Sequence, residues 1–418
     1  MTPKVYLPDD SGIVRKAELL ISDVLRGGVL ISAATIILGV VGFFLERATN
    51  MAVPTTYPHA FANVLAGVER LDPLAIIVLG LILLLATPVV RVAVSIAAFA
   101  VEEDQTYVII TGLVFAILIF SIFGMGDWLT QPIPKPVQDD TFSFFFLILF
   151  GSGFAGFIGA LAGLGGGILV VPILTLGFHV PFPDAIGASI VSVIATSSGA
   201  AAVYVKDRLA NLRVGMLLEV ATTIGAISGA LLITVLNTSA LFIIFGVILL
   251  VSAGPMLLRL AEETPANVIN HRWAERLRLP SSYPNAATGT LEPYNVAHVR
   301  IGFGMMYVAG LVSGLLGIGS GTFKVLALDT AMRLPMRVST STSNFMIGVT
   351  AAASAGIYFQ RGDIDPVIAA PVALGVLGGA AIGAFVLPRL SNVRLRKIFI
   401  PIVVLVALNM LARGFGWL

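Results

Sequence analysis

Cysteine is absent from this chain of 418 residues, and charged residues make up only 11% of it. The missing thiols exclude disulfides, cysteine catalysis and thiolate metal sites. Charged side chains usually account for about a quarter of a soluble domain, whereas here 57% of the residues are hydrophobic. So little polar surface cannot keep the chain in water, and we expect an all-α, polytopic protein whose solvent is the lipid bilayer.

Patterns that carry chemistry in other protein classes are also scarce. The sequence has four histidines without metal-ligand spacing, so we expect no metal site and no cofactor: His59, His179, His271 and His298. "GIGSGTFK" lacks the GK[ST] ending of a phosphate-binding loop. The net charge of +2 is spread over short loops and predicts no nucleic-acid partner. Ser320 between two glycines resembles a nucleophile turn, so a membrane-embedded enzyme stays a minor alternative, but we expect no catalytic residue and no enzyme.

Long apolar runs recur along the chain and have the length of membrane-spanning helices. About 20 residues are needed to cross roughly 30 Å of hydrocarbon. A polar, proline-bearing linker, "GDWLTQPIPKPVQDD" (126–140), divides the chain into a three-helix unit (1–135) and a larger region (136–418). The expected spans are 24–45, 74–99, 106–126, 143–163, 184–204, 214–236, 239–258, 298–316, 338–359, 366–388 and 398–414, with a hydrophilic stretch at 259–297.

The larger region contains an internal duplication, with one repeat at about 143–258 and the other at about 298–414. "LAGLGGGILVVPIL" (161–174) aligns with "LLGIGSGTFKVLAL" (315–328) at an offset of 154. The same offset pairs Tyr204 with Tyr358 and Asn211 with Asp365. Between these motifs we expect a slip of two residues, which pairs Pro183 with Pro335 and Ser189 with Ser341. A duplication of this size predicts two structurally similar halves.

Positive charge predicts the orientation of the spans. With the N-terminus in the cytoplasm, 18 of the 25 lysines and arginines lie in cytoplasmic segments and five lie outside. This distribution follows the positive-inside rule. The loop at 206–213 then lies inside and its counterpart at 361–365 lies outside, so the repeats are inverted.

Glycine clusters interrupt one apolar segment in each repeat. The stretches that follow, 168–177 and 322–333, are short for a full span and predict half-helices. Inverted repeats with broken helices are typical of secondary transporters, whose substrate sites lie near the bilayer midplane. Unsatisfied N–H groups at such helix starts favour anions. The alternative is that the glycines only allow close helix packing.

Lys324 is a charged residue inside the second of these segments. A charged lysine at membrane depth costs about 2.5–3.5 kcal/mol, which indicates a missing negative partner. An anionic substrate meets this need. The alternatives are a side chain that reaches the membrane interface, a pair with Glu219 on another helix, or an uncharged lysine.

The helix after each glycine cluster carries hydroxyl and amide side chains on one face. Ser189, Ser192 and Thr196 share that face in the first repeat, and Ser341 and Asn344 lie at similar places in the second. Such groups bind oxyanions, but they also bond to neighbouring helices or to their own backbone. The candidate substrate-binding residues are therefore Lys324, Gly165, Gly166, Gly167, Gly319, Ser320, Gly321, Ser189, Ser192, Ser341 and Asn344.

The order of these motifs resembles that of a known family. "GALAGLGGGILVVPIL" and "SGLLGIGSGTFKVLAL", each before a Ser/Thr-rich helix, with "YVKDRLANLRVG" and "YFQRGDIDPVIAAPVALGVLGGAAIGA", are similar to the TauE/SafE sulfite exporters. The resemblance covers about 143–414 and implies a multi-pass carrier of sulfite or sulfonate anions in a prokaryotic plasma (inner) membrane. The second repeat departs from the pattern at Ser320, Lys324 and Leu326. Residues 20–125 resemble a separate three-helix membrane domain of unassigned function.

Energy favours export as the direction of transport. A monoanion that leaves a cell with a negative interior gains about 2.3 kcal/mol per 100 mV, so no coupling ion is required. We therefore expect a secondary transporter that exports a small organosulfur anion, such as sulfite or sulfoacetate, by alternating access. A passive anion channel satisfies the same argument. The sequence leaves homo-oligomerisation open, and it favours an accessory role for residues 1–135, with Arg91 paired to an acid such as Asp104 or reaching the cytoplasmic interface.

Overall fold

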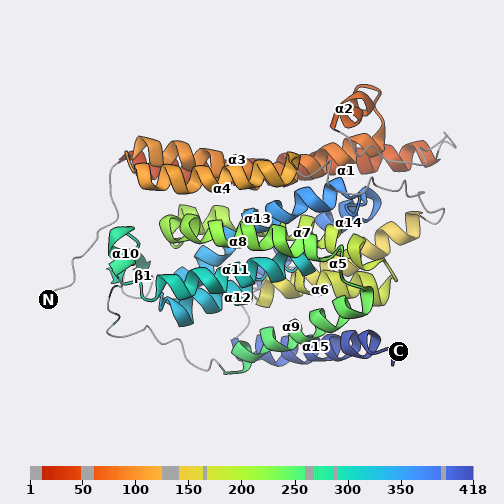
Figure 1. Cartoon of the computed structure of the whole chain (residues 1–418). Helices are drawn as coiled ribbons and strands as arrows, with labels where there is room; N and C mark the ends of the chain where they lie inside the picture. The colour runs from red at the N-terminus through yellow and green to blue at the C-terminus, as the bar shows by residue number, and fades with distance from the viewer. Residues whose placement is uncertain are drawn as a thin grey trace.

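Helices dominate the computed structural model (Figure 1). The structure describes residues 12–48, 61–124, 141–162, 167–258, 268, 270, 272–285, 290–386 and 392–417. Eight helices in this part of the chain are long and apolar enough to cross a membrane, by length and composition. Of the other three expected spans, two contain shorter apolar segments, Thr238–Gly254 and Ile400–Gly414, and the third is the hydroxyl-rich helix at 336–360. The prediction of an all-α polytopic membrane protein is confirmed.

The N-terminal unit consists of three long helices and one short helix along one face of the molecule. They are α1 (Gly12–Ala48), α2 (Phe61–Glu69), α3 (Pro73–Val101) and α4 (Gln105–Phe123). Asp72 starts α3, because its carboxylate accepts a hydrogen bond from the Leu74 N–H at 3.0 Å and proline at the first helical position loses no intrahelical bond. The sequence did not predict α2.

The two repeats have matching elements. The first contains α5 (Thr141–Ala162), α6 (Gly167–Pro172), the π-helical turn η2 (Ile173–Gly177), α7 (Phe182–Lys206), α8 (Leu212–Leu232) and α9 (Thr238–Leu258). The second contains α11 (Val299–Leu316), α12 (Gly321–Leu326), η3 (Ala327–Ala331), α13 (Met336–Gln360), α14 (Pro366–Val386) and α15 (Asn392–Gly414). Both predicted half-helices are present, as α6 with η2 and as α12 with η3.

The hydrophilic stretch between the repeats contains a helix and a hairpin that the sequence did not predict. These elements are α10 (Arg272–Arg276) and the antiparallel strands β1 (Ser281–Asn285) and β2 (Thr290–Tyr294). Asn211 joins them to the start of α8. Its amide donates to the Leu279 carbonyl and the Tyr294 hydroxyl, at 2.9 and 2.8 Å, while its side-chain oxygen caps Val214 N.

The alignment of the repeats keeps one offset throughout. Pro181 precedes α7 and Pro335 precedes α13 with nearly the same backbone angles, which places these prolines 154 residues apart. The expected slip of two residues is therefore wrong. Ser189 corresponds to Ser343, because their hydroxyls donate to the equivalent carbonyls of Gly167 and Gly321, each at 3.2 Å. The error arose because the first motif has a second proline, Pro183, two residues after Pro181, and the second motif has a serine at 341 as well as at 343.

Helix contacts follow the two-fold relation that an inverted pair requires. α5 packs on α14, and the equivalent pair α11 and α8 packs in the same way. α7 contacts its own counterpart α13, and α9 contacts α15 (Figure 1). Glycines allow the close approach at equivalent places: a Cβ on Gly225 would meet the Tyr307 carbonyl, and one on Gly379 would meet the Gly153 carbonyl.

Replacement of Gly379 by alanine is expected to destabilise the protein by about 1–3 kcal/mol, because the added methyl group overpacks the contact between α14 and α5. The neighbouring Gly378 is the matched control, since a Cβ there meets no atom within 4 Å. Alanine at Gly378 should be neutral or slightly stabilising, as in most helix interiors. Thermal unfolding of both variants in detergent measures the difference, and equal melting temperatures would contradict close packing at Gly379.

Candidate functional site

The second glycine loop is held in a backbone conformation that suits glycine. Gly317, Gly319 and Ser320 have φ values of 67°, 71° and 47°. This left-handed region is strained for residues with a Cβ. The loop ends α11 and starts the half-helix α12–η3, which runs from Gly321 to Ala331. That length is about half of a span, and the Met332 carbonyl just after it accepts a hydrogen bond from the Ala297 N–H beside the hydrophilic stretch, so the Gly321 end lies within the membrane-embedded part of the protein.

Ser189 joins Gly167, at the start of α6, to Gly317 in the glycine loop of the second repeat. Its hydroxyl lies 3.2 Å from the Gly167 carbonyl and 2.8 Å from the Gly317 carbonyl. A Cβ on Gly167 would collide with Val193, so this glycine serves close packing. Ser189 and Gly167 therefore fasten the centre of the fold, and the Ser189 proton is already engaged by backbone oxygens.

The other predicted residues differ in what they offer to a ligand. Ser192 is buried and donates to the Ser189 carbonyl on its own helix at 2.7 Å. Asn344 is half-buried and donates to the Thr340 carbonyl. Ser341 and Ser320 are buried, and the Ser320 hydroxyl has no hydrogen-bond partner within the described part of the chain. Gly165 and Gly166 lie outside the described residues.

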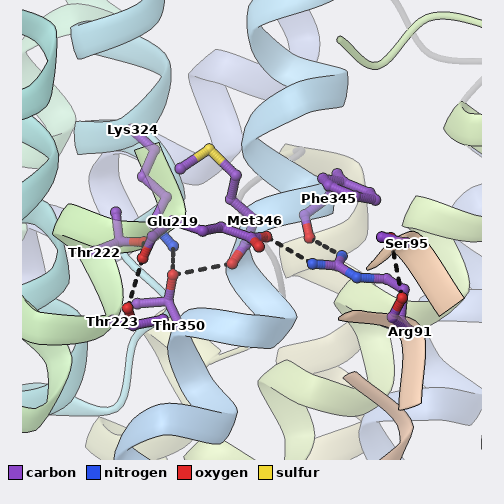
Figure 2. Close-up of polar contacts among 9 residues, drawn as sticks. All are labelled: Arg91, Ser95, Glu219, Thr222, Thr223, Lys324, Phe345, Met346 and Thr350. Atoms are coloured by element: carbon purple, nitrogen blue, oxygen red, sulfur yellow. Dashed lines mark hydrogen bonds and ion pairs between the residues drawn. The ribbon is translucent and has the colours of Figure 1, made fainter. Parts of the chain in front are cut away.

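Lys324 is completely buried on α12. Its ammonium group donates to the Thr350 hydroxyl on α13 at 2.8 Å, and that hydroxyl donates onward to the Met346 carbonyl (Figure 2). The side chain also experiences the electrostatic attraction of Glu219 on α8. The lysine therefore does not reach the membrane interface in this conformation.

Glu219 forms an ion pair with Arg91 of the N-terminal unit. The Arg91 Nη2 and Glu219 Oε1 atoms are 2.6 Å apart, and both side chains are almost completely buried. Arg91 also donates to the Phe345 carbonyl, and its guanidinium carbon lies 3.7 Å from the Phe345 ring centroid (Figure 2). The expected pair with an acid is confirmed, but the acid is Glu219 and not Asp104, which pairs with Arg213 at 3.2 Å. α3 directs Arg91 into the helix bundle, which the position of a residue along a span does not reveal.

Arg91, Glu219 and Lys324 form what we call the buried charge cluster. One member comes from the N-terminal unit, one from the first repeat and one from the second. With each group in its ordinary ionised form, the cluster has one net positive charge. Glu219 Oε2 has no hydrogen-bond partner among the described residues, so the carboxylate keeps acceptor capacity on the side away from Arg91 Nη2.

The charge cluster breaks the symmetry of the repeats. Thr350 and Lys324 of the second repeat correspond to Thr196 and Val170 of the first. Both threonines donate to a carbonyl four residues earlier on their own helix, but only the Thr350 hydroxyl also accepts a hydrogen bond from a lysine. The duplicated scaffold thus holds a cation at only one of its two equivalent positions.

A cavity of about 380 Å³ lies between α5, α7, α13 and α14. Its lining is mainly apolar, with a few polar groups that include Thr196, Ser197, Tyr204 and Asn344. Asn344 is the predicted site residue that borders it, and Lys324 is not part of its wall. α13 contributes both to this cavity and, through Thr350, to the charge cluster.

Arg91 and Thr350 are the residues at this centre that the sequence analysis did not place. The ion pair could have been predicted because Arg91 and Glu219 are opposite charges that both lie within apolar spans. The signal for Thr350 was its equivalence to Thr196, which the wrong register concealed.

The comparison with protein families identifies the larger region. The model of the sulfite exporter TauE/SafE family matches residues 147–410, which is more than half of the chain. The chain belongs to this family. Residues 21–123 match a separate domain of unknown function, DUF1634, so the TauE/SafE region and the helices that carry Arg91 are distinct in sequence.

Curated relatives of this TauE/SafE protein are described as probable membrane transporters. YunE of Bacillus subtilis is 25% identical over 280 residues, which are 65% of this chain and 98% of YunE. YdhB of the same organism is 29% identical over 55% of this chain and 83% of its own length. A protein of Xylella fastidiosa is 25% identical over 65% of this chain and 96% of its own length. No solved structure matches the chain.

Proposed function

We propose that this membrane transporter exports a small organosulfur anion, sulfite or a sulfonate such as sulfoacetate, by alternating access. The observation that carries the proposal is Lys324, a fully buried lysine on a half-helix at the junction of two repeats. Membership of the TauE/SafE family supports the class of substrate. A sulfonate or sulfite oxygen accepts strong hydrogen bonds from an ammonium group.

Lys324 and Thr350 form the centre of the proposed anion site. The neighbouring donors in this proposal are the N–H groups near Gly319–Gly321, and the Asn344 amide borders the cavity from the same helix as Thr350. In the described conformation Lys324 is closed off from the cavity. Anion binding therefore requires α13 to move relative to α12, and such a movement opens the lysine to one side of the membrane at a time.

Unequal packing of equivalent surfaces supports alternating access. Val203 borders the cavity and is 43% exposed, whereas its counterpart Ile357 is fully buried. Tyr204 also borders the cavity, but its counterpart Tyr358 is buried and donates to the Gly314 carbonyl at 2.7 Å. In an inverted pair, exchange of these two arrangements closes one side and opens the other.

The proposed setting is the plasma membrane of a prokaryote, with the N-terminus in the cytoplasm. The charge distribution then places the Lys206 end of α7, and the nearby cavity, on the cytoplasmic side. We propose residues 1–135 and 136–418 as the two units of the chain. Export of a monoanion is driven by the membrane potential at about 2.3 kcal/mol per 100 mV.

Proteoliposomes containing the purified protein are expected to transport radiolabelled sulfite or sulfoacetate with saturation. Unlabelled anion on the opposite side should accelerate this flux, because a carrier returns faster when loaded. The same anions should raise the melting temperature, since a ligand that binds only the native state stabilises it by mass action. Sulfate, taurine and simple carboxylates serve as comparison ligands.

A passive anion channel is the alternative, and the flux measurement separates it from a carrier. A channel shows no acceleration by anion on the opposite side. Absence of flux together with absence of thermal stabilisation by every organosulfur anion would contradict the proposed substrate class.

A further inference from the structure

The N-terminal unit of unassigned function contacts the transporter region at the charge cluster. α3 places Arg91 against Glu219 of α8 and Phe345 of α13. We propose that Arg91 is a positioning residue that holds Glu219 and so keeps this carboxylate from neutralising Lys324. The inference rests on the proposed function of Lys324, and it assigns the unit a part in transport that an accessory module would not have.

The members of the charge cluster are buried, and burial strengthens the interactions between their charges. Arg91 is 1% exposed, and Glu219 and Lys324 are both completely buried. A buried charge without a partner is strongly unfavourable, so the Glu219 carboxylate depends on its cations, while Lys324 is attracted by Glu219 and repelled by Arg91. Glu219 is attracted by both Arg91 and Lys324, but its ion pair of 2.6 Å is with Arg91. Lys324 donates to the neutral Thr350 hydroxyl instead.

The net charge of the cluster determines whether Lys324 is available to an anion. With Arg91 present, the cluster has one net positive charge, and Lys324 keeps its capacity to bind an anion. Without Arg91, Glu219 is a buried carboxylate whose remaining cation in the cluster is Lys324. An ion pair between these two side chains has no net charge and competes with the substrate for the ammonium group. Arg91 therefore acts on the anion through Glu219 and need not touch it.

Other contacts hold α13 in the same arrangement. Ser121 of α4 donates to the Ala353 carbonyl, and Gln360 at the end of α13 donates to the Ile122 carbonyl. α3 and α4 thus bond to α13 at Phe345, at Ala353 and at its last residue, Gln360. These bonds fix the helix that carries Thr350, the partner of Lys324, relative to the N-terminal unit.

A double-mutant cycle tests, without any ligand, whether Glu219 pairs with Lys324 once Arg91 is removed. Lys324→Gln should change the melting temperature little in the wild-type background, because Arg91 still satisfies Glu219. In the Arg91→Gln background the same change should clearly lower the melting temperature, because Glu219 then loses its last cation. The control background is Arg208→Gln, which breaks the partly exposed pair with Glu18 and should leave the Lys324 effect unaltered. Additive effects of Arg91→Gln and Lys324→Gln would overturn the inference.

Sulfite and sulfoacetate uptake into proteoliposomes tests the consequence for transport. Arg91→Gln should raise the half-saturating concentration about tenfold or more, because Glu219 then competes with the anion for the charged hydrogen bond of Lys324. Arg91→Lys should retain most of the affinity. The double variant Arg91→Gln, Glu219→Gln should recover it, because Lys324 no longer has a competing carboxylate.

The two proposals fail in different ways. If Lys324→Gln abolishes saturable transport while folded Arg91→Gln keeps wild-type half-saturation, the positioning role is wrong and the anion site stands. The positioning role is also wrong if the double variant Arg91→Gln, Glu219→Gln folds but is as impaired as Arg91→Gln alone. If Lys324→Gln transports normally, the anion site itself is wrong. If the wild-type protein moves neither anion, the ligand-free cycle still decides whether Arg91 keeps Glu219 from Lys324.

Discussion

Lys324→Gln is expected to weaken the binding of sulfite or sulfonate by about 1.5–3 kcal/mol, the usual contribution of a hydrogen bond to a charged group. This corresponds to a loss of affinity of roughly 10- to 150-fold. The glutamine keeps much of the length of the side chain and a hydrogen-bond donor for Thr350, but it removes the positive charge. The shift in melting temperature with anion concentration and the half-saturating concentration for transport both report the change.

Two further variants separate charge from shape. Lys324→Arg keeps the charge and should retain part of the affinity, although a guanidinium group fits the space beside Thr350 less well than an ammonium group. Lys206→Gln is the control, because this exposed lysine ends α7 outside the cluster and should leave affinity unchanged. Normal binding and transport by a folded Lys324→Gln variant would mean that the lysine is structural. The cavity beside Thr196 and Asn344 would then be the place to search for the substrate.

Arg91→Met is expected to lower the free energy of unfolding toward the lower end of the roughly 3–5 kcal/mol seen when one partner of a buried ion pair is removed. The reason is that Glu219 is left as a buried carboxylate, and Lys324 is the remaining cation of the charge cluster. The shape of the side chain is largely kept, so the loss reflects charge more than packing.

Arg208→Met is the matched control for this prediction. Arg208 also pairs with an acid across the boundary between the N-terminal unit and the first repeat, Glu18 at 3.0 Å, but its side chain is 24% exposed. Exposed ion pairs contribute about 0–1 kcal/mol, so the change should be small. Thermal unfolding in the same detergent compares the two variants, and an equal loss would contradict the energetic difference between the buried and exposed pairs.

Much of the secondary structure follows from the order of apolar and polar residues. The expected span at 184–204 lies within α7, and the half-helix expected at 168–177 is α6 with η2. Such elements are predictable because a membrane-embedded backbone must satisfy its hydrogen bonds within each segment. The hairpin β1–β2 was missed, since its strands have no apolar alternation and are held by Asn211 from a distant helix.

The residues of the candidate site were also predictable only in part from the sequence. Lys324 was recognisable because a cation inside an apolar run is costly wherever the run lies. Ser189 was placed on the correct helix, but the sequence did not show that its hydroxyl bridges Gly167 and Gly317. Asn344 was also chosen for its helix face, and the fold places it beside the cavity.

The sequence by itself determined the membrane solvent, the spans, the duplication at an offset of 154 and the presence of one unusual lysine. These features depend on local composition and on matches along the chain, which folding does not alter. Tertiary structure decided the partners. In the folded protein Arg91 pairs with Glu219, 128 residues away in the chain, and not with the expected Asp104. Thr350 lies against Lys324. The physical reason is that a buried charge selects its partner by proximity in the folded bundle, and this proximity depends on how α3, α8, α12 and α13 pack together.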